Sequence, residues 1–207
     1  MQSIRSIIED LAKFPVASIY EGIGKFGDVS NRIKPLVPGM RIAGTALTVK
    51  VFPGDMQAVF HAIEIAQPGD VLVVDAGDAE RGTIFGGTGM AAAIAKGIVG
   101  LVTNGAVRDY AELVEAKFPT FCTGVSLRGT VRGHLGWINV PIALGDVPIN
   151  PGDIVLGDED GVLIIPKDNA AKSLELSVAQ HEREQQRDAR LRNGESVSVV
   201  LNLPSRP

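Results

Sequence analysis

The spacing of hydrophobic residues changes several times along the first third of the chain. Residues 1–25 carry apolar side chains at helical spacing, which predicts two helices broken near Pro15. Residues 26–40 are polar and contain two prolines, as is typical of a loop. Residues 41–52 are rich in β-branched side chains and predict a strand, whereas residues 56–66 return to helical spacing. This pattern predicts helices packed on a sheet.

The middle of the chain alternates between apolar runs and small residues. Residues 71–74 and 98–103 predict strands buried on both faces, with a small-residue helix over 91–96 between them. This alternation favours a parallel sheet segment covered by helices. After Pro119, glycine, threonine and valine dominate, and residues 150–166 predict two short strands around a tight turn. We therefore expect a mixed α/β layered domain with a strand-rich second half.

A charged helix is predicted near the C-terminus. Asp168 suits its N-cap and Gly194 its stop, so the helix should cover about residues 168–193. Residues 170–178 include apolar side chains that can pack, but residues 181–192 have almost none. A helix this polar gains little stability from a core of its own. We expect its second half to be solvated or to lie against another subunit.

Composition narrows the class of protein. With 207 residues, of which 45% are hydrophobic, the chain is long enough for one globular domain with a full core. A net charge of −4 without a basic run argues against nucleic acid as a partner. The single cysteine, Cys122, excludes an internal disulfide, and we expect it to be buried in a protein of a reducing compartment. A secretory leader and a bilayer-length apolar stretch are not evident, so we expect a cytoplasmic protein without membrane partners.

A glycine-rich stretch, Gly86-Gly87-Thr88-Gly89, lies between a predicted strand and a predicted helix. Glycine lets backbone N–H groups converge on a ligand, and a helix N-terminus favours an anion. The stretch therefore predicts an anion site. A tight strand-to-helix turn with close packing is the alternative, because the motif matches neither a dinucleotide fingerprint nor a P-loop.

Arg108 and Asp109 follow the predicted strand 98–103. The guanidinium fork of arginine suits a carboxylate, and aspartate offers a hard oxygen ligand for magnesium or manganese. A surface ion pair, or a capping box from Asp109 to Glu112, is the alternative. Strand, glycines, helix, strand and Arg-Asp form one βαβ unit, so both stretches should meet at one end of the sheet. A carboxylate held by the glycines and Arg108, with a metal on Asp109, describes an α-keto acid site.

Other reactive side chains carry weaker signals. Lys50 and Lys96 could form Schiff bases only if they are buried. Residues 158–161 are acidic, but a turn explains them better. The histidines form no zinc motif and are scattered at His61, His134 and His181.

The spacing of Gly87, Arg108-Asp109 and Glu112 resembles the signature of the RraA-like family. Twenty residues separate Gly87 from Arg108, and two separate Asp109 from Glu112. The stretches "RIAGTALTV", "GDVLVVDAG", "GIVGLVTNGAVRD" and "INPGDIVLGDEDGVLIIP" also resemble family blocks in the same order, over roughly residues 15–195. The resemblance implies one domain over residues 1–207 with a layered β/β/α fold of the swivelling-domain type, assembled as a trimer or a dimer of trimers.

The catalytic branch of that family implies a role for each residue. Its members are 4-hydroxy-4-methyl-2-oxoglutarate aldolases, carbon–carbon lyases that need a divalent metal such as Mg²⁺ or Mn²⁺ and are expected to decarboxylate oxaloacetate. The backbone of Gly86–Gly89 would bind the pyruvyl end, Arg108 its carboxylate, and Asp109 would be the direct metal ligand. Glu184, or alternatively Glu182, would approach the metal's waters from the C-terminal helix of a neighbouring subunit.

Glu112 bears on the choice between two functions. Aldolase members carry an acidic residue at this position, and a water on the metal, tuned by Glu112 or Glu184, would take the proton from the substrate hydroxyl. The family also contains non-catalytic regulators that bind and inhibit an endoribonuclease of the RNase E type, which is the alternative function. We expect the pocket for the distal group of the substrate in the loops 78–85 and 120–129.

Overall fold

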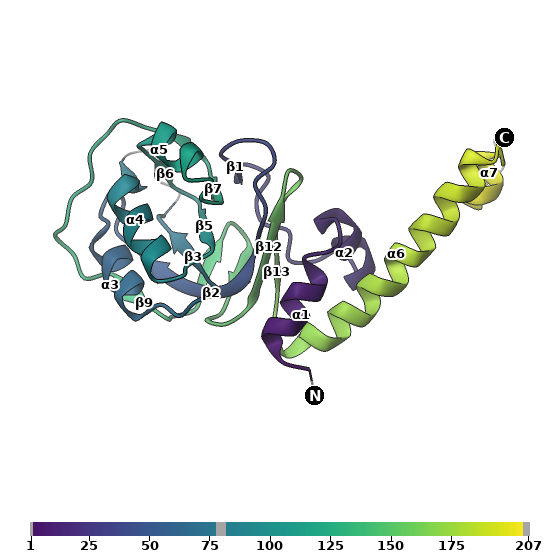
Figure 1. Cartoon of the computed structure of the whole chain (residues 1–207), viewed down its shortest axis with the longest axis horizontal. Helices are drawn as coiled ribbons and strands as arrows, with labels where there is room; N and C mark the ends of the chain where they lie inside the picture. Colours follow the sequence, from purple (N-terminus) through teal and green to yellow (C-terminus); the bar gives the residue numbers. More distant parts are fainter. Residues whose placement is uncertain (1, 78–81, 205–207) are drawn as a thin grey trace.

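An eight-stranded sheet forms the centre of the protein, whose computed structural model describes residues 2–77 and 82–204 (Figure 1). The strand order is β1-β7-β5-β3-β2-β12-β13, and β9 pairs with the end of β2. The bounds are Lys34–Pro35 for β1, Ile42–Lys50 for β2, Asp70–Asp75 for β3, Gly100–Thr103 for β5, Thr120–Cys122 for β7, Trp137–Ile138 for β9, Ile154–Asp158 for β12 and Gly161–Ile165 for β13.

Four neighbouring strands of this sheet run parallel, as the alternating pattern predicts. Thr48 of β2 lies opposite Val73 of β3, and Val73 lies opposite Val102 of β5, which in turn lies opposite Phe121 of β7. β12 and β13 extend the sheet as an antiparallel hairpin that turns at residues 159–160. The tight turn predicted for this acidic stretch is therefore confirmed.

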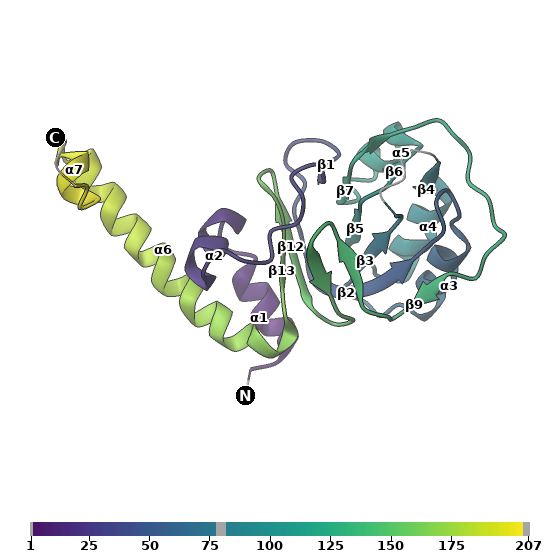
Figure 2. The same cartoon turned by 180° about the vertical axis from the view of Figure 1, so that it is seen from behind.

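Different elements cover the two faces of the sheet (Figure 2). Three helices pack on one face, namely α3 (Gln57–Ile65), α4 (Gly87–Ala95) and α5 (Tyr110–Glu115). A β-hairpin packs on the other face, made of β10 (Ile142–Leu144) and β11 (Val147–Ile149). Leu72 and Val74 of β3 point to the helices, whereas Val71 and Val73 point to the hairpin, because side chains alternate along a strand. This confirms the layered β/β/α arrangement.

A third cluster of apolar side chains joins the N-terminal helices to the β12–β13 hairpin. Helices α1 (Ile4–Leu11) and α2 (Val16–Ile23) are separated at Pro15, as predicted. Their buried side chains include Leu11 and Ile19, both fully buried. The hairpin thus packs on the two helices with one face and on the central core with the other.

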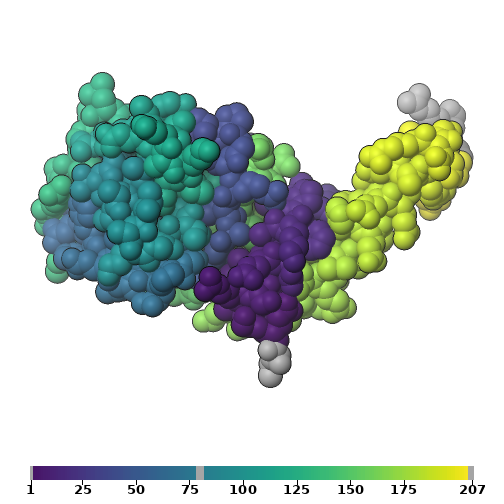
Figure 3. All heavy atoms as spheres, viewed as in Figure 1, coloured from purple at the N-terminus to yellow at the C-terminus, as the bar shows by residue number. Residues whose placement is uncertain are grey.

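Helix α6 (Ala170–Arg192) extends far beyond the rest of the protein and is followed by α7 (Val197–Val200) (Figures 1 and 3). Its first half packs on α1 and α2 through Ala170, Ser173 and Ser177. The helix was expected to begin at Asp168, but residues 167–169 form a 3-10 turn and Asn169 is the N-cap. Its predicted stop at Gly194 is confirmed by a left-handed φ of 84°.

Cys122 is buried, as expected, and burial raises the pKa of its thiol. Within the described residues, no helix has the length and hydrophobicity needed to cross a bilayer.

Candidate active site

A small parallel sheet of very short strands carries the candidate site. It has the order β4-β6-β8, with bounds Thr83–Phe85, Ala106–Val107 and Gly124–Val125. β6 separates the predicted strand 98–103 from Arg108, because the chain turns at Asn104-Gly105 after β5. The N–H of Arg108 continues the pairing by donating to the Phe85 carbonyl at 3.0 Å. The segments that follow β4 and β6 therefore leave the same edge of this sheet, as the βαβ unit predicts.

The glycine stretch forms the first turn of α4 instead of a loop before it. Gly86 is the N-cap and the helix begins at Gly87, four residues before the predicted start. A side chain at Gly86 would lie 2.5 Å from the Asp109 carboxylate, and one at Gly89 would lie 3.0 Å from the Phe85 ring. A side chain at Gly87 would collide with the carboxylate of Glu112. Glycine is needed here because α4 begins in close contact with the start of α5.

One hydrogen bond joins the two halves of the predicted motif. The N–H of Gly87 donates to Oδ2 of Asp109 at 2.8 Å. Asp109 has a left-handed backbone, with φ of 56°, and its side chain makes no capping bond to α5. The capping-box alternative is therefore wrong for Asp109, whose carboxylate binds the N-terminus of α4 and not its own helix.

Arg108 and Glu112 complete the cluster around this hydrogen bond. Nε of Arg108 lies 3.5 Å from Oδ2 of Asp109, and its side chain is 42% exposed. Glu112 lies in the first turn of α5, and its carboxylate lies against Gly87. A cation, two carboxylates and a helix N-terminus thus meet at one partly exposed place. Of the predicted substrate-binding stretch, the N–H groups of Thr88 and Gly89 have no intrahelical acceptor, because they lie in the first turn.

The donor set at this place suits a divalent cation. Asp109 and Glu112 are hard oxygen ligands, and magnesium is commonly bound by one or two carboxylates with water completing its shell. At this place and in the rest of residues 2–77 and 82–204, no three His, Cys, Asp or Glu side chains come together as a group that could hold a metal ion. A metal held by Asp109 and Glu112 would therefore take its remaining ligands from water or substrate, and the role of Asp109 as the direct ligand stays a prediction.

The predicted acidic residues of α6 lie elsewhere in the same chain. Glu184 accepts hydrogen bonds from Oγ of Ser18 at 2.6 Å and from Nε2 of Gln180 at 2.8 Å. Glu182 is exposed on the protruding part of the helix. Helix α6 lies at the opposite end of the molecule from α4 and α5 (Figure 1). Neither glutamate approaches Asp109 within one chain, so their role stays a prediction about a neighbouring subunit.

Asn104 was not identified from the sequence, although it supports the site. Its Oδ1 accepts from the N–H of Ala76 at 2.6 Å, and its Nδ2 donates to Asp75 at 3.1 Å. These bonds fasten the end of β3 to the turn that leads into β6. An Asn-Gly pair directly after a buried strand is the signal that could have indicated this turn.

The other candidates from the sequence have structural partners or are exposed. Lys50 and Lys96 are both exposed, which disfavours Schiff-base chemistry. Within the acidic turn, Asp158 accepts from the N–H of Val16 at 2.9 Å. The histidines lie apart from one another, with His61 near Glu64, His134 on Asp55 and His181 against Phe14.

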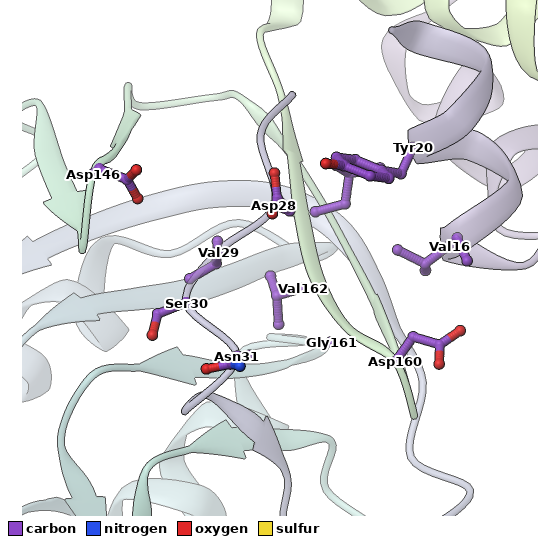
Figure 4. A pocket seen from close by; sticks show the side chains of 12 residues that line it. Val16, Tyr20, Asp28, Val29, Ser30, Asn31, Asp146, Asp160, Gly161 and Val162 are labelled. Atoms are coloured by element: carbon purple, nitrogen blue, oxygen red, sulfur yellow. The ribbon is translucent and has the colours of Figure 1, made fainter. Parts of the chain in front are cut away.

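A hollow of about 390 Å³ lies away from this cluster, between α2, residues 28–31 and the β12–β13 turn (Figure 4). Tyr20 lies beside Asp28 in it, and Asp146 and Asp160 also line it. Burial, reinforced by the charge of Asp28, raises the pKa of the Tyr20 hydroxyl. None of the residues from Gly86 to Glu112 lines this hollow, so it is separate from the candidate site.

Of the loops expected to hold the distal group of the substrate, residues 78–81 lie outside the described residues. The rest of the first loop consists of Gly82 and strand β4. The second loop includes the segment after β8, which begins beside Arg108, where the N–H of Ser126 donates to the Val107 carbonyl at 2.9 Å.

Comparison with known proteins relates this geometry to a family. Residues 16–164 match the RraA-like family, described as Aldolase/RraA. A protein of Halalkalibacterium halodurans, provisionally named a 4-hydroxy-4-methyl-2-oxoglutarate aldolase, is 40% identical over 161 residues, which cover 77% of this chain and 76% of that protein. A Thermus thermophilus protein named 4-hydroxy-4-methyl-2-oxoglutarate aldolase is 35% identical over 127 residues, covering 61% of this chain and 77% of that protein.

Solved structures agree with this relationship. RraAS2 of Streptomyces coelicolor, described as an unusual member of the RNase ES inhibitor RraA protein family, has a TM-score of 0.78 at 28% identity and covers 90% of this chain and 98% of its own. The RNA-processing inhibitor RraA of Thermus thermophilus has a TM-score of 0.67 at 28% identity, covering 74% and 93%. Because the family match spans most of the sequence and the fold agrees, this chain belongs to the RraA-like family.

Proposed function

We propose that the protein is a divalent-metal-dependent pyruvate aldolase. Its substrates would be 4-hydroxy-2-oxo acids such as 4-hydroxy-4-methyl-2-oxoglutarate. The observation that carries the proposal is the hydrogen bond from Gly87 to Asp109, which gathers Arg108 and Glu112 at the N-terminus of α4. The names of the relatives from Halalkalibacterium halodurans and Thermus thermophilus support the same chemistry.

The positive groups of the site account for binding of the pyruvyl end. The guanidinium of Arg108 is partly exposed and offers a planar pair of donors to a carboxylate. The free N–H groups of Thr88 and Gly89 add the partial positive charge of a helix N-terminus. Together they favour a substrate with a carboxylate next to a 2-oxo group.

The same groups favour the cleavage step. The 4-hydroxyl loses its proton, the bond between C3 and C4 breaks, and the electron pair forms an enolate whose negative charge lies on the 2-oxo oxygen. Arg108 stabilises this developing charge more strongly than it stabilises the neutral ketone. Protonation of C3 then gives pyruvate, and C4 leaves as a carbonyl compound. A divalent cation held by Asp109 would supply further Lewis-acid stabilisation of the oxyanion.

Glu112 is our candidate acceptor for the hydroxyl proton. Its carboxylate lies at Gly87, beside the place where the substrate would bind, and the ion pairs of the described histidines are with Glu64 and Asp55 instead. Proton transfer through one water is compatible with its exposed position. Oxaloacetate would give the same enolate when it loses carbon dioxide, so we also propose oxaloacetate decarboxylation as a side activity.

A pyruvate-release assay tests the proposal. The purified protein is incubated with 4-hydroxy-4-methyl-2-oxoglutarate or oxaloacetate, with Mg²⁺ or with EDTA, and pyruvate is measured. We expect release that depends on Mg²⁺ and exceeds the release from the same mixture without protein. If neither substrate yields metal-dependent pyruvate, the aldolase proposal fails.

The alternative function is regulation of an endoribonuclease. It is favoured by the likeness to RraAS2 and to the RNA-processing inhibitor of Thermus thermophilus. Direct binding to an RNase E-type enzyme, together with inhibition of its RNA cleavage and no pyruvate release, would support the regulator instead. We further propose that the protein assembles as a homotrimer or homohexamer, which light scattering would establish.

A further inference from the structure

Arg128 lies in the segment that leaves the small sheet next to Arg108. Ala106 pairs with Gly124 and Val107 pairs with Val125, so Ser126 continues the register beside Arg108. The hydrogen bond from the Ser126 N–H to the Val107 carbonyl, at 2.9 Å, shows that the pairing extends this far. Neighbouring strands lie about 4.8 Å apart, and two residues of chain span at most about 7 Å. The backbone of Arg128 is therefore close to the candidate site.

The backbone of Arg128 is fixed at both of its polar groups. Its N–H donates to Oγ of Ser126 at 3.2 Å, and its carbonyl accepts from Oγ of Thr83 at 2.9 Å. Thr83 is the first residue of β4, which leads directly into the glycine turn. The segment after β8 is thus tied to β6 at Val107 and to the start of β4 at Thr83, so that the backbone of Arg128 is fixed before a ligand binds.

The side chain of Arg128 is available to a ligand. Arg128 is exposed, and its guanidinium has no ion-pair or hydrogen-bond partner among the described residues. Arg132, in the same segment, instead lies over the Phe60 ring, with Cζ 5.1 Å from the ring centroid. The two arginines differ in surroundings, and Arg128 is the one whose backbone is tied to β4 and to the strand beside Arg108.

The side chains described so far provide a cation for only one of the two carboxylates of the substrate. Arg108 and the helix N-terminus account for one carboxylate of the substrate, at its pyruvyl end. Even with a divalent cation on Asp109, the pyruvyl carboxylate and the 2-oxo oxygen would engage Arg108 and the metal, so a distal carboxylate would gain from a further cation of its own. We infer that Arg128 binds the distal carboxylate of the substrate and thereby selects dicarboxylic 4-hydroxy-2-oxo acids over monocarboxylic ones. This inference rests on the proposed aldolase function.

A matched pair of substrates tests the inference. 4-Hydroxy-4-methyl-2-oxoglutarate carries the distal carboxylate, and 4-hydroxy-4-methyl-2-oxopentanoate has a methyl group in its place. Arg128→Ala should lower kcat/KM for the dicarboxylic substrate by about 10- to 100-fold, the usual effect of removing a charged hydrogen-bond partner. It should leave kcat/KM for the monocarboxylic substrate within about twofold. Arg128→Lys should retain part of the preference, and Arg132→Ala should change neither value.

Competitive inhibition gives a second measurement that does not require turnover of the monocarboxylic substrate. Arg128→Ala should raise the inhibition constant of 2-oxoglutarate by about 10-fold or more, without changing that of 2-oxopentanoate. Equal effects of Arg128→Ala on both members of either pair, or no effect, would overturn the inference while leaving the aldolase function intact. Absence of pyruvate from both substrates with the unmodified protein would contradict the aldolase function, and the inference with it.

Discussion

At the scale of single residues, Gly87 and Asp109 define the candidate site through one hydrogen bond of 2.8 Å. The absence of a side chain at Gly87 lets the carboxylates of Asp109 and Glu112 approach the first turn of α4. The pattern of one βαβ unit predicted that the glycine stretch and Arg108-Asp109 would meet. The hydrogen bond from the Gly87 N–H to Asp109 was not predictable, because a capping box within α5 has the same spacing. The structure excludes that capping box, since Asp109 has a left-handed backbone and makes no capping bond.

Two substitutions separate metal binding from oxyanion stabilisation. Asp109→Ala should abolish Mg²⁺-dependent turnover, because it would remove the proposed metal ligand. Arg108→Ala should lower kcat by about 100- to 1,000-fold, as loss of an oxyanion donor does. Steady-state kinetics across a Mg²⁺ titration measure both effects, with Glu115→Ala as a control for an exposed carboxylate on the same helix. Wild-type rates in either variant would refute its assigned role.

Gly87→Ala tests whether the Glu112 carboxylate must lie close to the first turn of α4. A methyl group at this position would displace the Glu112 carboxylate, and misplacement by about 1 Å can lower a rate about 100-fold. Stability should change little, because alanine favours a helix by about 1 kcal/mol over glycine and offsets the crowding. Kinetics and urea unfolding of the same sample would show a loss of rate without unfolding. Gly129→Ala is the control, since a side chain there meets no atom within 4 Å.

At the scale of elements, the long strands and helices were predictable, whereas the small sheet was not. β2, β3 and β5 have continuous apolar or β-branched runs that specify buried strands. β6 and β8 have two residues each, so tertiary pairing and not local pattern forms them. The start of α4 was also missed, because glycine normally disfavours a helix and here tertiary packing overrides that preference.

Asp55 fastens the segment after β8 to the start of α3, and this contact should depend on pH. Burial by itself raises the pKa of Asp55, but hydrogen bonds from the backbone of Gln57, Gly133 and His134 and from the His134 ring outweigh it, so the pKa is lowered overall. A lowered folded pKa contributes stability that is present above the unfolded pKa, near 4, and is lost as pH falls through the folded value.

The Asp55 variant gives the matching measurement. Asp55→Ala should lower the free energy of unfolding at pH 7 by on the order of 3 kcal/mol, because it removes a buried carboxylate that accepts from three backbone N–H groups. Between pH 4 and pH 2, its stability should fall less steeply than that of the unmodified protein. Urea unfolding at several pH values tests this, and parallel pH profiles for the two proteins would contradict it.

At the scale of the whole molecule, the projecting α6 is the feature that one chain leaves unexplained (Figure 3). The sequence indicated it correctly, because the second half of the helix has almost no apolar side chains. Its position relative to a second copy could not be predicted, since a polar helix surface does not specify its partner.

A mixing experiment tests whether Glu184 acts on the site of a neighbouring subunit. Asp109→Ala and Glu184→Gln should each be nearly inactive alone. Oligomers formed from equal amounts of both should regain about a quarter of wild-type activity, because a quarter of the sites pair an intact Asp109 with an intact Glu184. Glu182→Gln, at the alternative position on the same helix, should keep its activity alone if Glu184 is the residue that acts. Mixtures no more active than the mean of the two variants would place Glu184 outside the site.

The central claim is that this protein forms the enolate of pyruvate, and hydrogen exchange measures that step directly. Pyruvate is incubated with the protein in D₂O, and loss of its methyl proton signal is followed by NMR. We predict exchange well above the buffer rate that requires Mg²⁺, stops with EDTA and is lost in Asp109→Ala. Exchange at the buffer rate in the presence of Mg²⁺ or Mn²⁺ would contradict the claim.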